Sequence, residues 1–352
     1  MAENHKKVTR FSSEETSVFC EQIAMLLNSG IPLYEGVDML YSDMEDKKIK
    51  KVFEKINTSI KANETLYDSL QRTEAFPDYM IHMVKVGETT GKLEEVMKSL
   101  ATYYERESSI KTSIKSAIAY PAVLFTMMAV IIFVLVFRIL PMFEVMFIEL
   151  NADVATATHN MMQIGMSAGK ILAGITCLTL FVMLVVFSWY RTKRGEATIR
   201  RFMTNFRLTK KISEAIATSR FISSMALMIS SGIETRKAID IAHGASNNRR
   251  VKDRIKQCKM LMDKGISLDK AIHDTKILVG MESRLVTVAT KTGAQDTIFE
   301  KLSEQYNTKV ATMLNKLTTS IETALVVMLA VLVGGVLISV MLPLVSMISS
   351  IG

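Results

Sequence analysis

Residues 87–92 read GETTGK, the closest approach in this sequence to a loop that binds phosphate. Such a loop places four residues between its first glycine and the Gly-Lys pair, and its lysine precedes a hydroxyl that binds Mg²⁺. Here only three residues intervene, and Leu93 follows Lys92. The segment also lies between two predicted helices, with no predicted strand before it. We therefore expect no nucleotide site at this turn.

Two other short patterns hint at a penicillin-binding enzyme. Ser-x-x-Lys begins at Ser108 and at Ser167, and Lys-Thr-Gly begins at Lys291. The Ser-Asp-Asn element of such enzymes is absent, and no segment alternates as the strands of their sheet would. The residues that could complete a catalytic triad or a zinc site are too dispersed to do so. They are His5, His82, His159, His243, His273, Cys20, Cys177 and Cys258. The sequence thus predicts no enzyme, with no catalytic residue, metal or cofactor.

Three acidic residues, Glu88, Glu94 and Glu95, lie in and after the same turn. Carboxylate oxygens are the ligands that Ca²⁺ and Mg²⁺ prefer, so a cation contact is one interpretation. The other is that these side chains lie at a helix N-terminus, where the helix dipole favours negative charge. We favour the second interpretation and predict no metal site.

Charge is divided unevenly along the chain. Residues 191–316 carry 25 Lys and Arg against 12 Asp and Glu, whereas the first 118 residues carry 16 against 19. A basic half could bind nucleic acid. Aromatic residues are scarce there, however, and the densest cations lie beside an apolar window, where anionic lipid would attract them. We expect no nucleic acid; an acidic partner protein is the other candidate.

The elements that must position these residues begin with three windows that contain no charged side chain. They are residues 116–137, 171–190 and 323–352. A helix needs roughly 20 apolar residues to cross a bilayer core of about 30 Å, so each window is long enough to span a membrane. Three such windows would need a far larger soluble protein to bury them. We expect an integral membrane protein with three crossings.

The distribution of Lys and Arg predicts the orientation, because cytoplasmic loops are enriched in both near the ends of spans. The segment between the first two windows is poor in cations and carries Glu144, Glu149 and Asp153. Residues 191–211, after the second window, are strongly basic. No apolar stretch precedes the first window, so we expect no signal peptide. The predicted topology has the N-terminus inside and the C-terminus outside, with most of the protein facing the cytosol.

The sequence repeats itself at a constant offset of 202 residues. Residues 19–30 read FCEQIAMLLNSG and residues 221–232 read FISSMALMISSG. Residues 86–91 read VGETTG and residues 288–293 read VATKTG, and Pro141 corresponds to Pro343. Convergent helical patterning would not keep glycines and prolines in register over such a distance. We infer two copies of one unit, and the second window has no counterpart.

Each copy is predicted to be helical. Apolar residues recur at helical spacing and no segment alternates as a strand does. The predicted helices of the first copy are 14–29, 33–42, 47–61, 65–71, 78–89 and one from 92 into the first span. Those of the second are 218–231, 235–245, 247–264, 268–274, 279–292 and one from 295 into the third span. The fold class is therefore all-α, with two homologous six-helix cytosolic bundles and three transmembrane helices.

These features divide the chain into eight parts. They are a flexible N-terminus (1–12), a first cytosolic helical domain (13–116), transmembrane helix 1 (117–140), an external loop (141–169), transmembrane helix 2 (170–190), a basic cytosolic linker (191–217), a second cytosolic helical domain (218–318) and transmembrane helix 3 (319–346).

Three short motifs together resemble a known family. Residues 26–32 read LLNSGIP, residues 87–93 read GETTGKL, and Tyr120-Pro121 stands at the membrane boundary before the whole unit repeats. This combination resembles the GspF/PilC family, the polytopic inner-membrane platform of type IV pilus assembly and type II secretion. The matching positions are Gly30, Pro32, Gly87, Glu88, Gly91, Pro121, Pro141, Gly232, Gly293 and Pro343. The second copy departs from the motif: Thr290 replaces Glu88, and Glu322-Thr323 replaces Tyr120-Pro121.

The resemblance implies a scaffold rather than an enzyme, in the cytoplasmic (inner) cell membrane. The implied partners are a hexameric assembly ATPase, pilin or pseudopilin subunits, other inner-membrane assembly proteins, membrane lipid and further copies of the chain, as a dimer or larger oligomer. Movement of the ATPase would pass through the platform to insert subunits into a growing filament. The alternatives are a small transporter or channel subunit with regulatory cytosolic domains, which normally places polar groups inside its spans, and a membrane-bound enzyme regulated by its cytosolic parts.

Overall fold

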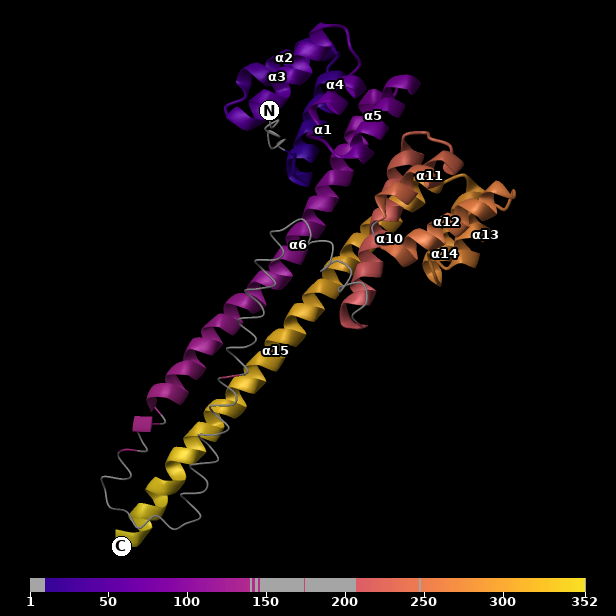
Figure 1. The fold of residues 1–352 in the computed structure, drawn as a ribbon. Helices are drawn as coiled ribbons and strands as arrows, with labels where there is room; N and C mark the ends of the chain where they lie inside the picture. The colour runs from indigo at the N-terminus through magenta and orange to yellow at the C-terminus, as the bar shows by residue number, and fades with distance from the viewer. Residues whose placement is uncertain are drawn as a thin grey trace, which may run out of the picture. The chain divides into compact units, whose positions relative to one another are not determined.

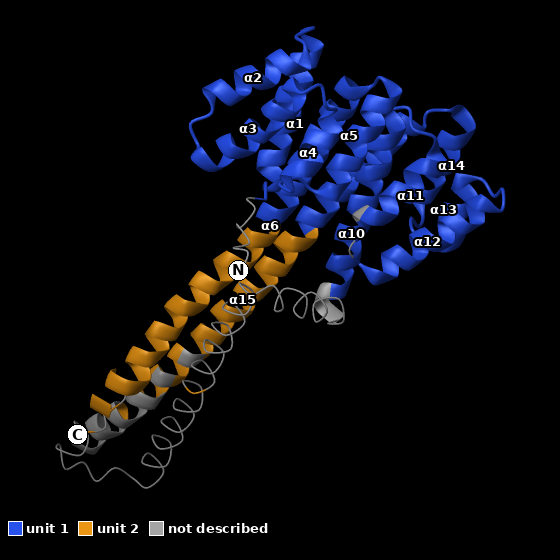
Figure 2. Cartoon of the chain, turned by 45° about the horizontal axis from the view of Figure 1, so that its top comes forward, with its two compact units in different colours: residues 1–113, 207–312 blue, residues 114–206, 313–352 orange. Residues whose placement is uncertain are grey.

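The computed structural model describes residues 10–139, 141–142, 145, 174, 207–246 and 248–351. Every secondary-structure element within these ranges is a helix, which confirms the all-α class (Figure 1). The chain forms two compact units, coloured separately in Figure 2. Unit 1 contains residues 1–113 and 207–312, and unit 2 contains residues 114–206 and 313–352.

The first half of unit 1, here called module 1 (residues 13–113), consists of five helices and the start of a sixth. They are α1 (Ser13–Asn28), α2 (Leu33–Asp43), α3 (Lys47–Lys61), α4 (Leu66–Thr73), α5 (Asp78–Thr90) and α6 (Leu93–Val134). Local sequence sets their starts. Ser12 and Glu15 form a reciprocal capping box at α1, and the Asp46 carboxylate accepts hydrogen bonds from two backbone N–H groups at the start of α3.

The second half, module 2 (residues 207–312), repeats this order. Its helices are α10 (Arg207–Ser230), α11 (Thr235–Ala245), α12 (Arg249–Asp263), α13 (Leu268–Thr275), α14 (Met281–Thr292) and the start of α15 (Gln295–Ile351). In both modules the predicted helices are present, with ends shifted by at most two residues at all but one boundary. The exception is α10, which begins at Arg207 rather than at 218. No glycine or proline interrupts this stretch, and Ile212 and Ala217 are buried, so packing extends the helix into the segment predicted as a linker.

The core of unit 1 contains equivalent residues from the two modules. Phe19 of α1 and Phe221 of α10 stand 202 positions apart, and they are 1% and 0% exposed. Leu100 and Leu302 are buried as a second equivalent pair. The duplication read from the sequence is therefore also a duplication of the core.

Each module buries one cysteine, Cys20 in module 1 and Cys258 in module 2. Burial raises the pKa of the Cys20 thiol far above its ordinary value and raises that of Cys258 to about 12. Thiols react as thiolates, so both should be inert in the folded protein. We expect N-ethylmaleimide to label neither residue in membranes at pH 7.5 and to label both in denaturant, as read by peptide mass spectrometry. Rapid labelling of either residue without denaturant would contradict the burial of its module.

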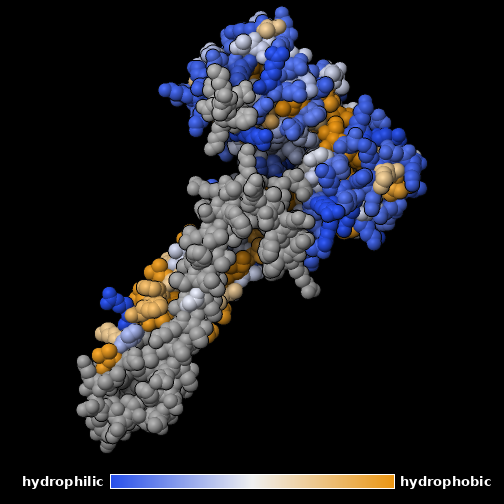
Figure 3. All heavy atoms as spheres, viewed as in Figure 1, coloured by the Kyte–Doolittle hydropathy of each residue, from blue (hydrophilic) through white to orange (hydrophobic). Residues whose placement is uncertain are grey.

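In unit 2, the continuations of α6 and α15 present apolar side chains outward. Met128, Ile132 and Val136 of α6 pack with Leu325 and Leu329 of α15. Beyond this small cluster most large apolar residues are exposed. In Figure 3 the described part of unit 2 is largely hydrophobic, whereas the described surface of unit 1 is mostly hydrophilic. Exposed apolar surface of this extent suits lipid rather than water.

Three of the described helices are long and apolar enough to cross a membrane. Leu93–Ile139 covers all but the last residue of the predicted first span, and Gln295–Gly335 covers the predicted third span from its start at residue 319 to residue 335. The third, Lys210–Ser230, has 61% of its apolar window buried and carries charged residues, so we assign it to the core of unit 1. The predicted second span, residues 170–190, lies outside the described residues. The long apolar helices mark a multi-pass membrane protein.

Candidate functional site

The turn between α5 and α6 contains the acidic residue that the sequence singled out. The Glu88 carboxylate reaches the start of α4, where its two oxygens accept hydrogen bonds from the backbone N–H groups of Leu66 (2.6 Å) and Tyr67 (3.0 Å). Glu94 and Glu95 instead lie in the first turn of α6. No group of three potential metal ligands was found in the described part of the chain. Glu88 therefore fits the interpretation that an acidic side chain lies at a helix N-terminus, where the helix dipole favours negative charge. The helix concerned is α4, however, and not α6, which follows the turn.

The second module lacks this cap. Thr290 stands at the position of Glu88 and donates its hydroxyl hydrogen bond to Val286 O within α14. Ser267, which precedes α13, makes no side-chain capping bond. The loss of the acidic residue is thus accompanied by an uncapped helix, so the two modules differ at this turn.

We expect Glu88→Ala to lower the free energy of unfolding of module 1 by about 1–3 kcal/mol, because it removes charge-assisted bonds to two backbone N–H groups. The matched control is Thr290→Ala, which removes no contact between helices and should change the stability of module 2 little. The denaturant dependence of Cys20 and Cys258 labelling would report each module separately. Equal effects of the two substitutions would contradict the capping role.

The other positions of the family motif lie at helix ends or inside the long helices. Gly30, Gly91, Gly232 and Gly293 each follow a helix with positive φ. At Gly91 and Gly293, φ is +70° and +77°, a conformation that ends α5 and α14 and that a side chain would strain. Pro32 precedes α2, Pro121 lies within α6, Pro141 follows the π-helical turn Leu135–Ile139, and Pro343 lies within α15. Gly87 packs closely against Val96, since an added Cβ would lie 3.1 Å from the Val96 Cβ.

The most distinctive polar contact of unit 1 joins its two modules. Glu107 of α6 accepts two hydrogen bonds from the Arg220 guanidinium of α10, at 2.8 and 2.5 Å. Their side chains are only 12% and 18% exposed. Paired N–H···O bonds fix the relative orientation of a guanidinium and a carboxylate, so this contact specifies how the modules pack.

Further hydrogen bonds surround this ion pair. Arg106 Nη1 donates to Ser303 Oγ of α15 at 2.8 Å, and the Ser303 and Ser223 hydroxyls lie 2.6 Å apart. Burial raises the pKa of Tyr103 to about 12, with the nearby Glu107 charge as a second cause, while the Arg220 charge and the Ser224 hydroxyl lower this pKa. The interface between the modules is therefore polar and buried at the same time.

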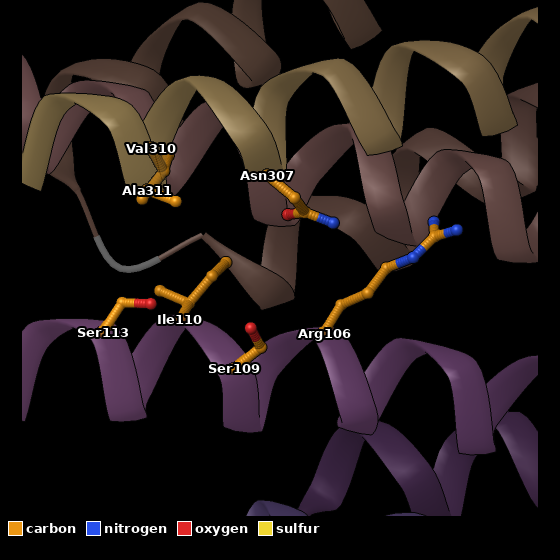
Figure 4. A pocket seen from close by; sticks show the side chains of 7 residues that line it. All are labelled: Arg106, Ser109, Ile110, Ser113, Asn307, Val310 and Ala311. Atoms are coloured by element: carbon orange, nitrogen blue, oxygen red, sulfur yellow. The ribbon is translucent and has the colours of Figure 1, made fainter. Parts of the chain in front are cut away.

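A small cavity of about 60 Å³ lies between α6 and α15 beside this network. Figure 4 shows side chains of both helices bordering it: Arg106, Ser109, Ile110, Ser113, Asn307, Val310 and Ala311. Asn307 Oδ1 accepts a hydrogen bond from Ser219, and its buried Nδ2 has no protein partner among the described residues. The volume is sufficient for a few water molecules, for which Ser109, Ser113 and Asn307 offer polar partners among the apolar side chains of the lining.

Sequence reasoning did not find Glu107, Arg220 or Arg106. A signal was nevertheless present in the repeat. Lys309 stands at the position of Glu107 in the second copy, and Val18 stands at the position of Arg220 in the first. The two copies therefore differ in charge at both positions that form the ion pair. Where two contacting residues both differ in charge from their equivalents in the other copy, the two copies use different faces to contact each other.

The duplication and its boundaries are also found in comparison with known proteins. The family described as "Type II secretion system (T2SS), protein F" matches residues 19–141 and again residues 221–343, at the offset of 202 residues inferred from the sequence. The chain is 28% identical to a type IV pilus assembly protein PilC of Myxococcus xanthus, over 95% of the chain and 80% of that protein.

Two further relatives bear the two kinds of name found among the matches. A PilC of Thermus thermophilus is 25% identical over 96% of the chain and 84% of its own length. A type II secretion system protein F of Xanthomonas campestris is 24% identical over 95% of the chain and 83% of its own length. Because the family matches both halves of the chain and covers most of its length, this chain belongs to the family of type II secretion system protein F and its pilus-assembly relatives.

Proposed function

We propose that this chain is the membrane platform of a type IV pilus or type II secretion machine and has no catalytic activity of its own. The observation that supports this most is the double family match, residues 19–141 and 221–343, in which each copy includes most of one helical module and the apolar segment that follows it. The names of the relatives point to the same two machines.

The geometry suggests how such a platform could pass on movement. In each copy the last module helix, α6 or α15, continues without a break into the apolar segment. A continuous helix can carry a rotation or tilt of its module toward the membrane without any chemistry. The Glu107–Arg220 pair would make the two modules respond together. In this proposal the input comes from a hexameric assembly ATPase and the output moves pilin or pseudopilin subunits into the filament.

The proposed topology follows from the charge distribution. Residues 13–116 and 218–318 face the cytosol, residues 117–140, 170–190 and 319–346 cross the cytoplasmic membrane, and the C-terminus lies outside. The middle span returns the chain so that both modules face the same compartment. Other inner-membrane assembly proteins, lipid and further copies of this chain complete the set of proposed partners.

Deleting the gene tests the role. We expect the deletion strain to lose filaments or secretion, while the assembly ATPase remains folded and hydrolyses ATP at a normal rate. Plasmid-borne expression of the full chain should restore assembly. Normal filaments in the deletion strain would overturn the proposal, and co-purification of the chain with the ATPase would support the proposed coupling.

The two modules should bind different partners, because they differ in net charge: residues 207–312 carry 19 Lys and Arg against 11 Asp and Glu, whereas residues 13–113 carry 12 against 18. We expect reversal of two exposed cations of α12, Lys252→Glu with Lys256→Glu, to weaken one of the two proposed contacts, with the ATPase or with the pilin-like subunits, and to spare the other. Lys51→Glu with Lys55→Glu, also exposed and four residues apart on the equivalent helix of module 1, α3, is the matched control. Pull-down of each partner with the full chain measures the effect, and equal loss of both contacts would argue against the division.

A further inference from the structure

The two modules contact each other head to tail, that is, through non-equivalent faces. From module 1, α6 contributes Tyr103, Glu107 and Ile110, which we call A-face positions. From module 2, α15 contributes Ser303, Asn307 and Val310, which we call B-face positions. At the repeat offset of 202, the B-face positions correspond to residues 101, 105 and 108 of α6, two residues before each A-face position. Two residues are about 200° of rotation in a helix, so the A and B faces are nearly opposite.

Each module therefore has one face that the internal contact does not use. In module 1 this is the B face, where α1 and α6 border a groove of about 780 Å³. In module 2 it is the A face, where Gln305, Lys309 and Thr312 are all exposed. The difference between used and unused faces is clear at one equivalent pair: Arg220 is 18% exposed, whereas Val18 at the same position of module 1 is 48% exposed.

The unused faces match each other in apolar surface. On the B face of module 1, Val18 and Met25 lie seven residues apart on α1 and are 48% and 61% exposed. On the A side of module 2, Met281 and Val288 lie seven residues apart on α14 and are 69% and 54% exposed. Residues seven apart share one side of a helix, so each unused face presents an apolar pair of similar length.

The unused faces also match in charge. The groove of module 1 is bordered by four carboxylates and a single lysine: Glu14, Glu21, Glu94, Glu105 and Lys98. The A side of module 2 presents the exposed cations Arg284 and Lys309, of which Lys309 also forms an ion pair with Glu282 at 3.1 Å. Opposite charges around an apolar centre are the arrangement expected of a protein–protein interface.

Unit 2 repeats this asymmetry. Ile132 of α6 is 1% exposed at the contact with Leu325 and Leu329 of α15. Gly334 stands at the position of Ile132 in the second copy, and no atom of the described residues lies within 4 Å of the place where its Cβ would be. A glycine on a membrane helix permits close approach of another helix. The A side of α15 is thus shaped for a neighbouring span as well.

We propose that the B face of module 1 binds the A face of module 2 from a second copy of this chain, as an extension of the internal contact. The inference takes up the homo-oligomer of the proposed function and assigns its surface. All copies keep their spans in one bilayer, so they are related by rotation about the membrane normal. Repetition of a head-to-tail contact about one axis produces a closed ring where the rotation between neighbouring copies is a whole fraction of a turn.

The test exchanges the charges of the two faces. Val18→Arg places a guanidinium opposite Lys309 of the next copy, and Lys309→Glu places a carboxylate opposite the acidic groove. We expect each single variant to weaken self-association at least tenfold. In the double variant, the new arginine at position 18 of one copy faces the new glutamate at position 309 of the next, as Arg220 faces Glu107 within one chain. The double variant should therefore recover self-association. Analytical ultracentrifugation of the full chain in detergent, over a range of protein concentrations, measures the association constant.

Glu54→Lys on α3 is the control for a charge reversal elsewhere on module 1, and it should leave self-association unchanged. Lys309→Glu also removes the ion pair with Glu282, but the single and double variants share that loss, so recovery of self-association reports the contact between copies alone.

An oligomeric wild type with unaffected single variants would overturn the assigned faces only. A monomeric wild type would overturn the oligomer too, while filament loss on gene deletion would still support the platform role. Single variants that lose filaments but keep self-association would show that another partner occupies these faces.

Discussion

Replacing Arg220 by methionine is expected to be among the most damaging single changes in unit 1. It leaves the Glu107 carboxylate, whose side chain is only 12% exposed, without its two hydrogen bonds from the guanidinium and with Lys111, at 4.0 Å, as its remaining cation. Removing one partner of a buried ion pair costs about 3–5 kcal/mol, because the remaining charge has lost both water and its counter-charge. We expect faster amide hydrogen exchange along α10 and in the part of α6 around Glu107, together with loss of filament assembly.

Two comparisons separate this effect from general damage. The double variant Glu107→Gln with Arg220→Met removes both charges and should regain most of the lost stability, since neither ion is then buried alone. Lys61→Met breaks the ion pair between Lys61 and Asp38, whose side chains are 54% and 47% exposed, and should change stability little. If the double variant were as unstable as Arg220→Met, the ion pair would not be the cause.

The helices of both modules could be predicted from the sequence because their signals are local. The capping residue Ser12, the glycine at 91 and the apolar spacing around Phe19 each act within a few residues. The repeat offset then required the second module to follow the order of the first. The start of α10 could not be predicted in this way, because burial of Ile212 and Ala217 depends on the rest of the module.

The site was harder to predict than the fold because its contacts join residues that are distant in the sequence. Glu88 drew attention through its motif, but its partner is the N-terminus of α4, 22 residues earlier in the chain. Glu107 and Arg220 are 113 residues apart and carry no motif. Contacts between elements so distant in sequence depend on packing, and only the mismatch between the repeats at these two positions hinted at them.

Equivalent core truncations in the two modules should have large but separate effects. Phe19→Ala and Phe221→Ala each remove a fully buried aromatic ring, a change that typically costs 3–5 kcal/mol, or at least about a hundredfold in the population of the opened state. Hydrogen bonds and one ion pair lie at the contact between the modules, and apolar residues of both modules form one continuous core. Phe19 packs on Phe53 and Phe76 of its own module, so we expect each truncation to open its own module first and to leave the other largely folded.

The two buried cysteines make this prediction measurable in one experiment. Phe19→Ala should accelerate maleimide labelling of Cys20 about a hundredfold and leave Cys258 nearly unchanged, and Phe221→Ala should do the reverse. Equal acceleration of both thiols in either variant would show that unit 1 opens as a single body. Independent opening would mean that a force on one module need not unfold the other. The Glu107–Arg220 contact would then be the route by which the modules influence each other, as a platform that couples two partners requires.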